Sequence, residues 1–322
     1  MAVYTKITSK HISQINKKFN FGKIISFKGI KKGVENTNYL LKTKTNKYIL
    51  TLFEKRVDQK DIPFFMKLMK QLNKSEIKCP RPLNDNMGNY QFKIKKKTAC
   101  IVSFLEGKDK RQLSYKNCFD IGKYIAQMHV ITKKLTLFRK NSLAINKLDT
   151  LFKNINFKKI KLIDNLESFL YFNLKEIKKK WPKKLPTGII HGDLFIDNIF
   201  FKKNKISGII DFYFSGNDFY IYELAICINA LCFDKKNNKF KINNKKIKNL
   251  ISGYECIKNL SNEEKNSINI LCKGAAIRYL LTRVYDYCNT PKKALINIKD
   301  PREYFQKLLI HNNLKTYKDY IN

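Results

Sequence analysis

The sequence predicts an α+β protein in two lobes, a small N-terminal lobe built on an antiparallel sheet and a larger, mainly helical C-terminal lobe. The chain has 322 residues, which is more than the roughly 250–300 residues that a single hydrophobic core usually serves. Short strand-like runs dominate up to about residue 105, and helical periodicity dominates from Gln112 onward. We therefore expect a β-rich lobe over residues 1–105 and a helical lobe over residues 106–322.

The first lobe alternates between strand-like runs and helical periodicity. In chain order, the predicted elements are a helix over residues 9–19, strands over 38–41 and 48–53, an amphipathic helix over 61–72, and strands over 90–94 and 98–104. The turn-like Thr45-Asn46-Lys47 separates the first two strands, so we expect them to form an antiparallel hairpin.

The second lobe is expected to be helical apart from one hairpin. Helical periodicity predicts a helix over residues 118–130 and one or two more over 148–180. Two apolar runs, 199–201 and 206–212, flank the turn-like Lys203-Asn204-Lys205 and predict the hairpin. The stretch 235–248 is rich in Lys and Asn, and we expect it to be a solvated loop or a loose helix.

The net charge would attract polyanions, but the basic residues are not those of a nucleic-acid-binding protein. The formal net charge is +39, yet only seven of the 65 basic residues are Arg. Arg is favoured for bidentate recognition of phosphates and bases, and here Lys is scattered along the whole chain instead of forming one stripe. A coding bias toward A- and T-rich codons explains this composition, so we expect no nucleic-acid partner.

The cysteines and the apolar runs are typical of a cytoplasmic protein. The eight cysteines are dispersed, contain no C-x-x-C pair and mostly have apolar neighbours, which predicts reduced, buried thiols. The N-terminus lacks the apolar core of a signal peptide, and no apolar run approaches the roughly 18 residues of a membrane span. We expect no membrane association and a cytoplasmic location.

One polar motif carries chemistry. The run IIHGDLFIDN, residues 189–198, has the spacing H-x-D-x-x-x-x-N, and Asp211 follows at the end of the predicted hairpin. Phosphoryl transfer to an alcohol needs a carboxylate beside the attacking hydroxyl group and oxygen ligands for a metal ion. Asp193 fits the first role, and Asn198 and Asp211 can supply oxygens to Mg²⁺. The alternative is that Asp193 and Asp197 only form a turn, which Asn198 caps.

The motif resembles the catalytic run of the aminoglycoside-phosphotransferase-like kinases, which have a two-lobed protein-kinase-like fold. Further stretches resemble the homoserine kinases of that superfamily: Ser26–Ile30, Gly33–Leu41, Ile49–Val57, Gly192–Phe195, Ile210–Phe214, Leu224–Asn229 and Ala276–Tyr287. The similarity covers most of the chain. It implies an ATP- and Mg²⁺-dependent kinase that converts L-homoserine to O-phospho-L-homoserine in threonine biosynthesis.

The resemblance also implies roles for individual positions. Asp193 would be the catalytic base, and Asn198 and Asp211 would bind magnesium. Residues 1–105 would be the nucleotide-binding lobe, and residues 106–322 the catalytic and substrate lobe. The implied ATP-binding positions are Gly29, Gly33 and Asn38 in a loop over the phosphates, and Ser103 and Leu105 in a hinge whose backbone binds adenine.

Two departures from the family pattern stand out. Kinases usually place a Lys in the third strand and pair it with a Glu in the next helix. Here Thr51 occupies the expected Lys position, and the helix over 61–72 contains no Glu. Either Lys55 or Arg56 reaches the phosphates from the strand end, or phosphate binding rests on the loop and the metal. The second departure is Glu223, which replaces the family's usual Asp and is expected to have a structural role.

An amino-acid substrate needs a cation for its carboxylate and an acceptor for its ammonium group. Arg278, Arg283 and Asp286 lie on one helical segment, and they are the candidate substrate residues. The alternative is an Arg–Asp pair on a solvated or packed face. Two other functions compete with this one: a kinase of a choline-type, sugar-type or aminoglycoside acceptor, and a non-catalytic kinase-like binding module.

Overall fold

The computed structural model describes residues 4–30, 36–54, 57–290 and 298–322. The chain divides into two compact units. The first contains the chain up to Gly107 together with Ser207–Tyr213, and the second contains Lys108–Ile206, residues 214–290 and Ile298–Asn322. The fold class is α+β, as predicted, with an antiparallel sheet in the first unit and mainly helices in the second. The assignment of nucleotide binding to residues 1–105, and of catalysis and substrate binding to residues 106–322, stays a prediction.

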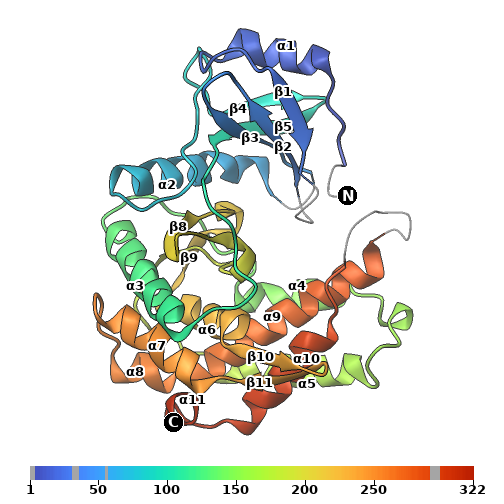
Figure 1. Ribbon diagram of the computed structural model, residues 1–322. Coiled ribbons are helices and arrows are strands. Elements are labelled where there is room, and N and C mark those ends of the chain that lie inside the picture. Colours follow the sequence, from blue (N-terminus) through green and yellow to red (C-terminus); the bar gives the residue numbers. More distant parts are fainter. Residues whose placement is uncertain (1–3, 31–35, 55–56, 291–297) are drawn as a thin grey trace. The chain divides into compact units, whose positions relative to one another are not determined.

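A five-stranded antiparallel sheet forms the centre of the first unit (Figure 1). In sheet order the strands are β1 (Ser26–Gly29), β2 (Thr37–Lys42), β3 (Lys47–Leu52), β5 (Lys97–Ser103) and β4 (Gln91–Ile94). The predicted β2–β3 hairpin is confirmed, with Asn38 opposite Thr51. Helix α1 (Ser9–Lys18) covers one face of the sheet, where Ile15 joins a core that includes Leu41 and Leu50.

Helix α2 (Ile62–Lys74) confirms the predicted amphipathic helix of this unit. Pro63 lies in its first turn, where a backbone N–H group has no acceptor within the helix. Proline, which lacks this group, therefore costs no helical hydrogen bond there. Segment Ser207–Tyr213 belongs to the same unit, because the Tyr213 ring lies 4.9 Å from the Phe53 ring and 5.8 Å from the Phe65 ring.

Helices build most of the second unit. They are α3 (Tyr115–Thr132), α4 (Leu148–Lys153), α5 (Leu166–Lys180), α6 (Tyr220–Leu231), α7 (Asn244–Glu255), α8 (Asn262–Asn266), α9 (Ile268–Asn289), α10 (Arg302–Asn313) and α11 (Lys318–Ile321). Helix α9 packs against α5, α6 and α10, which makes it the central helix of the unit (Figure 1). The short strands β6 (Thr187–Ile190) and β9 (Gly216–Phe219) pair antiparallel. Strands β7 (Ile199–Lys202) and β8 (Lys205–Ile209) pair as well, which confirms the second predicted hairpin.

Helices α3 and α7 pack backbone against backbone. A Cβ atom added at Gly122 would lie 1.9 Å from the carbonyl oxygen of Leu250, and one added at Gly253 would lie 2.0 Å from the carbonyl oxygen of Phe119. No side chain fits at these distances. The close approach of the two helices therefore depends on both glycines.

The prediction of a loop or loose helix over residues 235–248 is wrong for residues 235–242, whereas residues 244–248 are helical. Strands β10 (Phe233–Lys236) and β11 (Lys239–Ile242) form a hairpin there, and helix α7 follows at once. Asn237 and Asn238 turn the chain with φ angles of 48° and 59°, a conformation that Asn tolerates better than most residues. The Asn-Asn pair was the turn signal, and the surrounding Lys and Asn residues concealed it.

All eight cysteines are free thiols; seven are buried, as expected, and Cys256 is exposed. Within the described ranges, no helix is both long and apolar enough to cross a membrane.

Candidate active site

The loop that follows β6 is held by a buried carboxylate. The backbone N–H groups of His191 and Gly192 both donate to the carboxylate of Glu223, the latter at 3.1 Å. Glu223 comes from α6 and is fully buried. Gly192 has a φ angle of +78°, and a Cβ atom there would lie 2.9 Å from the carbonyl oxygen of Phe214. The structural role predicted for Glu223 is confirmed: it fixes the loop that carries Asp193.

The Asp193 carboxyl group is half-buried and bonded to α9. The Tyr279 hydroxyl group lies 3.1 Å from Asp193 Oδ1 and 3.3 Å from the Gly192 carbonyl oxygen. Burial raises the pKa of Tyr279 well above its ordinary value, so the hydroxyl group keeps its proton and donates. Burial also raises the pKa of Asp193, and the charges of Arg278 and Lys299 and the bond from Tyr279 oppose that rise. A carboxylate with a raised pKa is a stronger base, as proton abstraction requires.

Asn198 is tied to the same loop. Its Nδ2 atom donates to the Asp193 carbonyl oxygen at 2.8 Å, and its backbone N–H group donates to the Phe195 carbonyl oxygen at 3.0 Å. The side-chain bond orients the amide, so Oδ1 is the atom that remains as an acceptor.

Asp211 belongs to the first unit and follows β8 by two residues. It is half-buried and has a φ angle of +68°. That conformation is uncommon for a residue with a side chain and is concentrated at functional sites.

One amide oxygen and one carboxylate fit Mg²⁺, which usually takes one or two protein oxygens together with phosphates and water. In the part of the chain that the structure describes, no three His, Cys, Asp or Glu side chains gather into a metal site. The roles of Asn198 and Asp211 as magnesium ligands stay predictions.

Of the predicted phosphate-binding positions, Gly29 and Asn38 are described, whereas Gly33 and Lys55 lie outside the described residues. Gly29 is the last residue of β1 and pairs with Tyr39 of β2. The Thr51 hydroxyl group donates to Asn38 Oδ1 at 2.8 Å, so the position that usually carries Lys holds a side-chain hydrogen bond here. The roles of Gly29 and Asn38 stay predictions.

The predicted hinge begins where β5 ends. The Ser103 N–H group donates to the Arg81 carbonyl oxygen at 2.8 Å, and Ser103 Oγ accepts from the Arg81 N–H group at 2.8 Å. Leu105 is half-buried and packs against Gly208. These contacts fix the segment locally, and its role in adenine binding stays a prediction.

The three predicted substrate residues have different surroundings on α9. Arg278 is 1% exposed, and its Nε and Nη1 atoms find no hydrogen-bond acceptor among the described residues. Arg283 Nη1 lies 2.7 Å from the carboxylate of Glu303 and donates to the Asp300 carbonyl oxygen at 2.9 Å. Asp286 is half-buried one turn further along. The substrate roles of all three stay predictions.

Sequence reasoning missed Tyr279 and Lys299, although both act on Asp193. Arg278 was noticed because Arg is rare in this chain, but its neighbour Tyr279 is one of 17 tyrosines. Lys299 is equally inconspicuous among the many lysines. A contact between residues more than 80 positions apart leaves no local pattern in one sequence.

The chain matches known proteins along its length. The model of the phosphotransferase enzyme family matches residues 26–238. A homoserine kinase of Bartonella henselae is 39% identical over 98% of this chain and 98% of its own length. A homoserine kinase of Sinorhizobium fredii is 39% identical over 99% of this chain and 97% of its own length.

Solved structures support the fold. An amicoumacin kinase, solved in complex with AMP-PNP, Ca²⁺ and Ami, has a TM-score of 0.74 at 14% identity and covers 98% of this chain and 93% of that chain. A microcompartment-associated aminopropanol kinase has a TM-score of 0.69 at 13% identity and covers 95% of this chain and 94% of that chain. At these identities the likeness shows the kinase-like fold alone, whereas the curated relatives are close enough to show the family. The chain belongs to the homoserine kinases of the phosphotransferase enzyme family.

Proposed function

We propose that the protein transfers the γ-phosphoryl group of ATP to the hydroxyl group of L-homoserine, giving O-phospho-L-homoserine and ADP in threonine biosynthesis. The observation that carries this proposal is the Asp193 carboxylate, which accepts a hydrogen bond from Tyr279, in a chain that is 39% identical to homoserine kinases over nearly its whole length. We place the enzyme in the cytoplasm, because its proposed substrates are small and polar and none of the described helices could span a membrane.

In the proposed reaction, Asp193 orients the hydroxyl group of homoserine and accepts its proton as the oxygen attacks the γ-phosphorus. The bond between that phosphorus and the β–γ bridging oxygen breaks, and ADP leaves. Tyr279 holds Oδ1 of Asp193, which leaves Oδ2 for the substrate. The raised pKa of Asp193 makes its carboxylate a better proton acceptor.

Magnesium would be held by Asn198 and Asp211, together with the ATP phosphates. The ion supplies positive charge that offsets the charge of the transferring phosphoryl group. Support comes from the orientation of the Asn198 amide and from the φ angle of Asp211.

ATP would bind to the first unit. Gly29, Gly33 and Asn38 belong to the loop proposed to cover the phosphates, and Ser103 and Leu105 to the hinge proposed to contact adenine. Thr51 supplies no positive charge, so the phosphates depend on the loop, the metal and a cation such as Lys55.

The test is ADP release, coupled to a spectrophotometric signal, with MgATP and one acceptor at a time: L-homoserine, L-serine, L-threonine, choline, a hexose and kanamycin. We expect selective turnover of L-homoserine. Turnover of a different acceptor would support the kinase chemistry and overturn the assignment of homoserine as the acceptor. If no acceptor causes ADP release, the result would support a kinase-like binding module.

A further inference from the structure

The distance between the reacting and the charged groups of an amino-acid alcohol limits where its receptors can lie. In homoserine, two methylene groups separate the hydroxyl group from the carbon that bears the ammonium and carboxylate groups. By ordinary covalent dimensions, these charges lie about 5 Å from the hydroxyl oxygen. Side chains that bind them must therefore lie close to Asp193, reach solvent, and be free to exchange partners.

The two arginines predicted from the sequence fit these requirements poorly. Arg278 is 1% exposed, so its guanidinium group is out of reach of a ligand that enters from solvent. Arg283 is 7% exposed, and its guanidinium group is bonded to Glu303 and stacked 4.4 Å from the Tyr304 ring. Both guanidinium groups are thus less accessible than an exposed side chain, and their substrate roles stay predictions.

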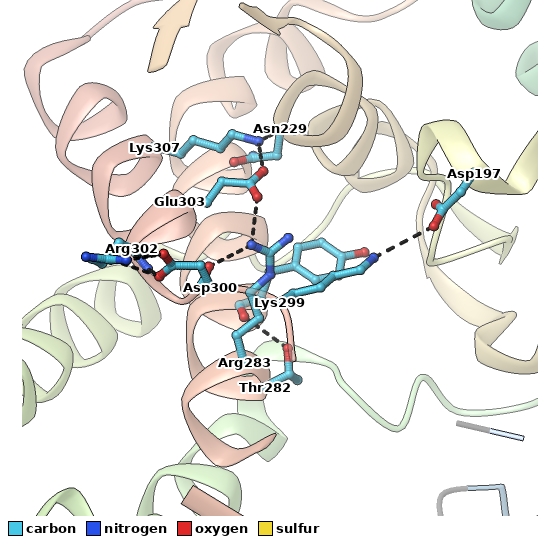
Figure 2. Close-up of polar contacts among 10 residues, drawn as sticks. Asp197, Asn229, Thr282, Arg283, Lys299, Asp300, Arg302, Glu303 and Lys307 are labelled. Atoms are coloured by element: carbon cyan, nitrogen blue, oxygen red, sulfur yellow. Dashed lines mark hydrogen bonds and ion pairs between the residues drawn. The ribbon is translucent and has the colours of Figure 1, made fainter. Parts of the chain in front are cut away.

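Lys299 and Asp197 are exposed and weakly paired, and the charges of both act on Asp193. Lys299 Nζ lies 3.9 Å from Asp197 Oδ2, and the side chains are 48% and 37% exposed (Figure 2). Asp197 is in the same loop as Asp193. Lys299 Nζ lies 4.8 Å from the centre of the Phe195 ring, and that ring contacts Tyr279, the residue bonded to Asp193.

The other cations near Lys299 are held more tightly. Figure 2 shows Arg302 bonded to Asp300 through two nitrogen atoms, and Arg283 and Lys307 bonded to Glu303, all at 2.7–3.1 Å. An exposed pair such as Lys299–Asp197 contributes little to stability. A ligand that separates the two groups and pairs its own charges with them therefore spends little binding free energy on breaking the pair.

We infer that Lys299 binds the α-carboxylate of the acceptor and that Asp197 binds its α-ammonium group, so that the two residues select a zwitterionic alcohol. This inference rests on the proposed function. It explains why an exposed cation is paired with an anion of the loop that carries Asp193, and it identifies the residues that distinguish an amino acid from other alcohols. The charge of Lys299 also favours the ionised form of Asp193, which agrees with its position.

The test combines two substitutions with two truncated acceptors. In Lys299→Met the cation is lost, and in Asp197→Asn the anion is lost while the shape is kept. 3-Amino-1-propanol is homoserine without its carboxylate, and 4-hydroxybutanoate is homoserine without its ammonium group. Lys265→Met is the matched control, because Lys265 forms a partly exposed ion pair with Glu255, at 2.8 Å, on a helix that does not carry the site.

For homoserine, we expect each of the two variants to lower kcat/KM about 10- to 100-fold, because each removes one charge-assisted hydrogen bond to the substrate. Lys299→Met should leave kcat/KM for 3-amino-1-propanol within about 3-fold of the wild type, and Asp197→Asn should do the same for 4-hydroxybutanoate. The KM for MgATP should stay unchanged in both. An acceptor turned over too slowly is assayed by its inhibition constant against homoserine.

The inference is wrong if Lys299→Met lowers kcat/KM for homoserine and for 3-amino-1-propanol equally, or if the KM for MgATP rises. The latter result would place Lys299 on the transferring phosphate, or Asp197 on the metal. A wild-type enzyme that does not phosphorylate homoserine at all would instead overturn the proposed function. The two failures are therefore distinguishable.

Discussion

Replacing Glu303 by Gln should destabilise the protein by about 3–5 kcal/mol, because Glu303 neutralises two buried cations. Its two carboxylate oxygens lie 2.7 Å from Lys307 Nζ and 2.7 Å from Arg283 Nη1 (Figure 2). The side chains of Lys307 and Arg283 are 4% and 8% exposed, so neither charge can turn to water. An amide keeps one acceptor oxygen and removes the charge, which leaves both cations uncompensated.

The effect should depend on pH. Burial would raise the pKa of Glu303, but the charges of Lys307 and Arg283 outweigh it and lower that pKa to about 2. Because the folded pKa is below the unfolded value of about 4.3, the carboxylate stabilises the fold above that pH and loses this effect as the pH falls toward 2. The difference between wild type and variant should thus be largest above about pH 5 and shrink below it.

Urea unfolding, followed by circular dichroism at pH 7 and at several values down to pH 3, measures both effects. Glu176→Gln is the matched control, because Glu176 also lies 2.7 Å from a Lys four residues away, but this pair is exposed. We expect the control to lose less than about 0.5 kcal/mol. A loss of less than about 1 kcal/mol at Glu303, or a loss that does not change with pH, would refute the reasoning.

Three further predictions concern the catalytic loop and the helix packing. Asp193→Asn should abolish turnover while MgATP binding, measured by calorimetry, persists; retained turnover would exclude Asp193 as the base. Tyr279→Phe removes a bond that favours the ionised carboxylate, so the pKa of Asp193 should rise and the acid limb of the kcat profile should move to higher pH. Tyr320→Phe, which removes a buried hydroxyl group that is bonded to His311 of α10, should leave that profile in place. Gly253→Ala forces α3 and α7 apart and should cost about 3 kcal/mol or more in urea unfolding, whereas the exposed Ser252→Ala should cost almost nothing; equal values would contradict the packing argument.

The sequence was sufficient for the fold class, both main hairpins and the polar motif of the catalytic loop. Short elements with clear turns, such as the pair joined by Thr45-Asn46-Lys47, are specified locally, and so is the spacing of Asp193 and Asn198. The β10–β11 hairpin was missed because both strands are only four residues long, and β10 has one apolar residue and shows no alternation, although Lys239–Ile242 does alternate.

The rest of the site depends on contacts between distant segments. Tyr279 reaches Asp193 from α9, and Arg283 finds Glu303 on α10 instead of a partner on its own helix. Neither pairing follows from helical spacing, because packing between helices decides it. Roles inferred for charged residues from a single helix are therefore the least secure part of a sequence-based site.

The contact between α3 and α7 also bears on how this sequence changes over evolutionary time. Every glycine codon begins with two guanines, so a gene that drifts toward A and T tends to lose glycine, and this chain keeps only 12. Gly122 and Gly253 persist where any side chain would push two backbones apart. In a chain with such a composition, Gly122 and Gly253 are positions where the backbone excludes every other residue, so their codons cannot follow the drift without separating the two helices.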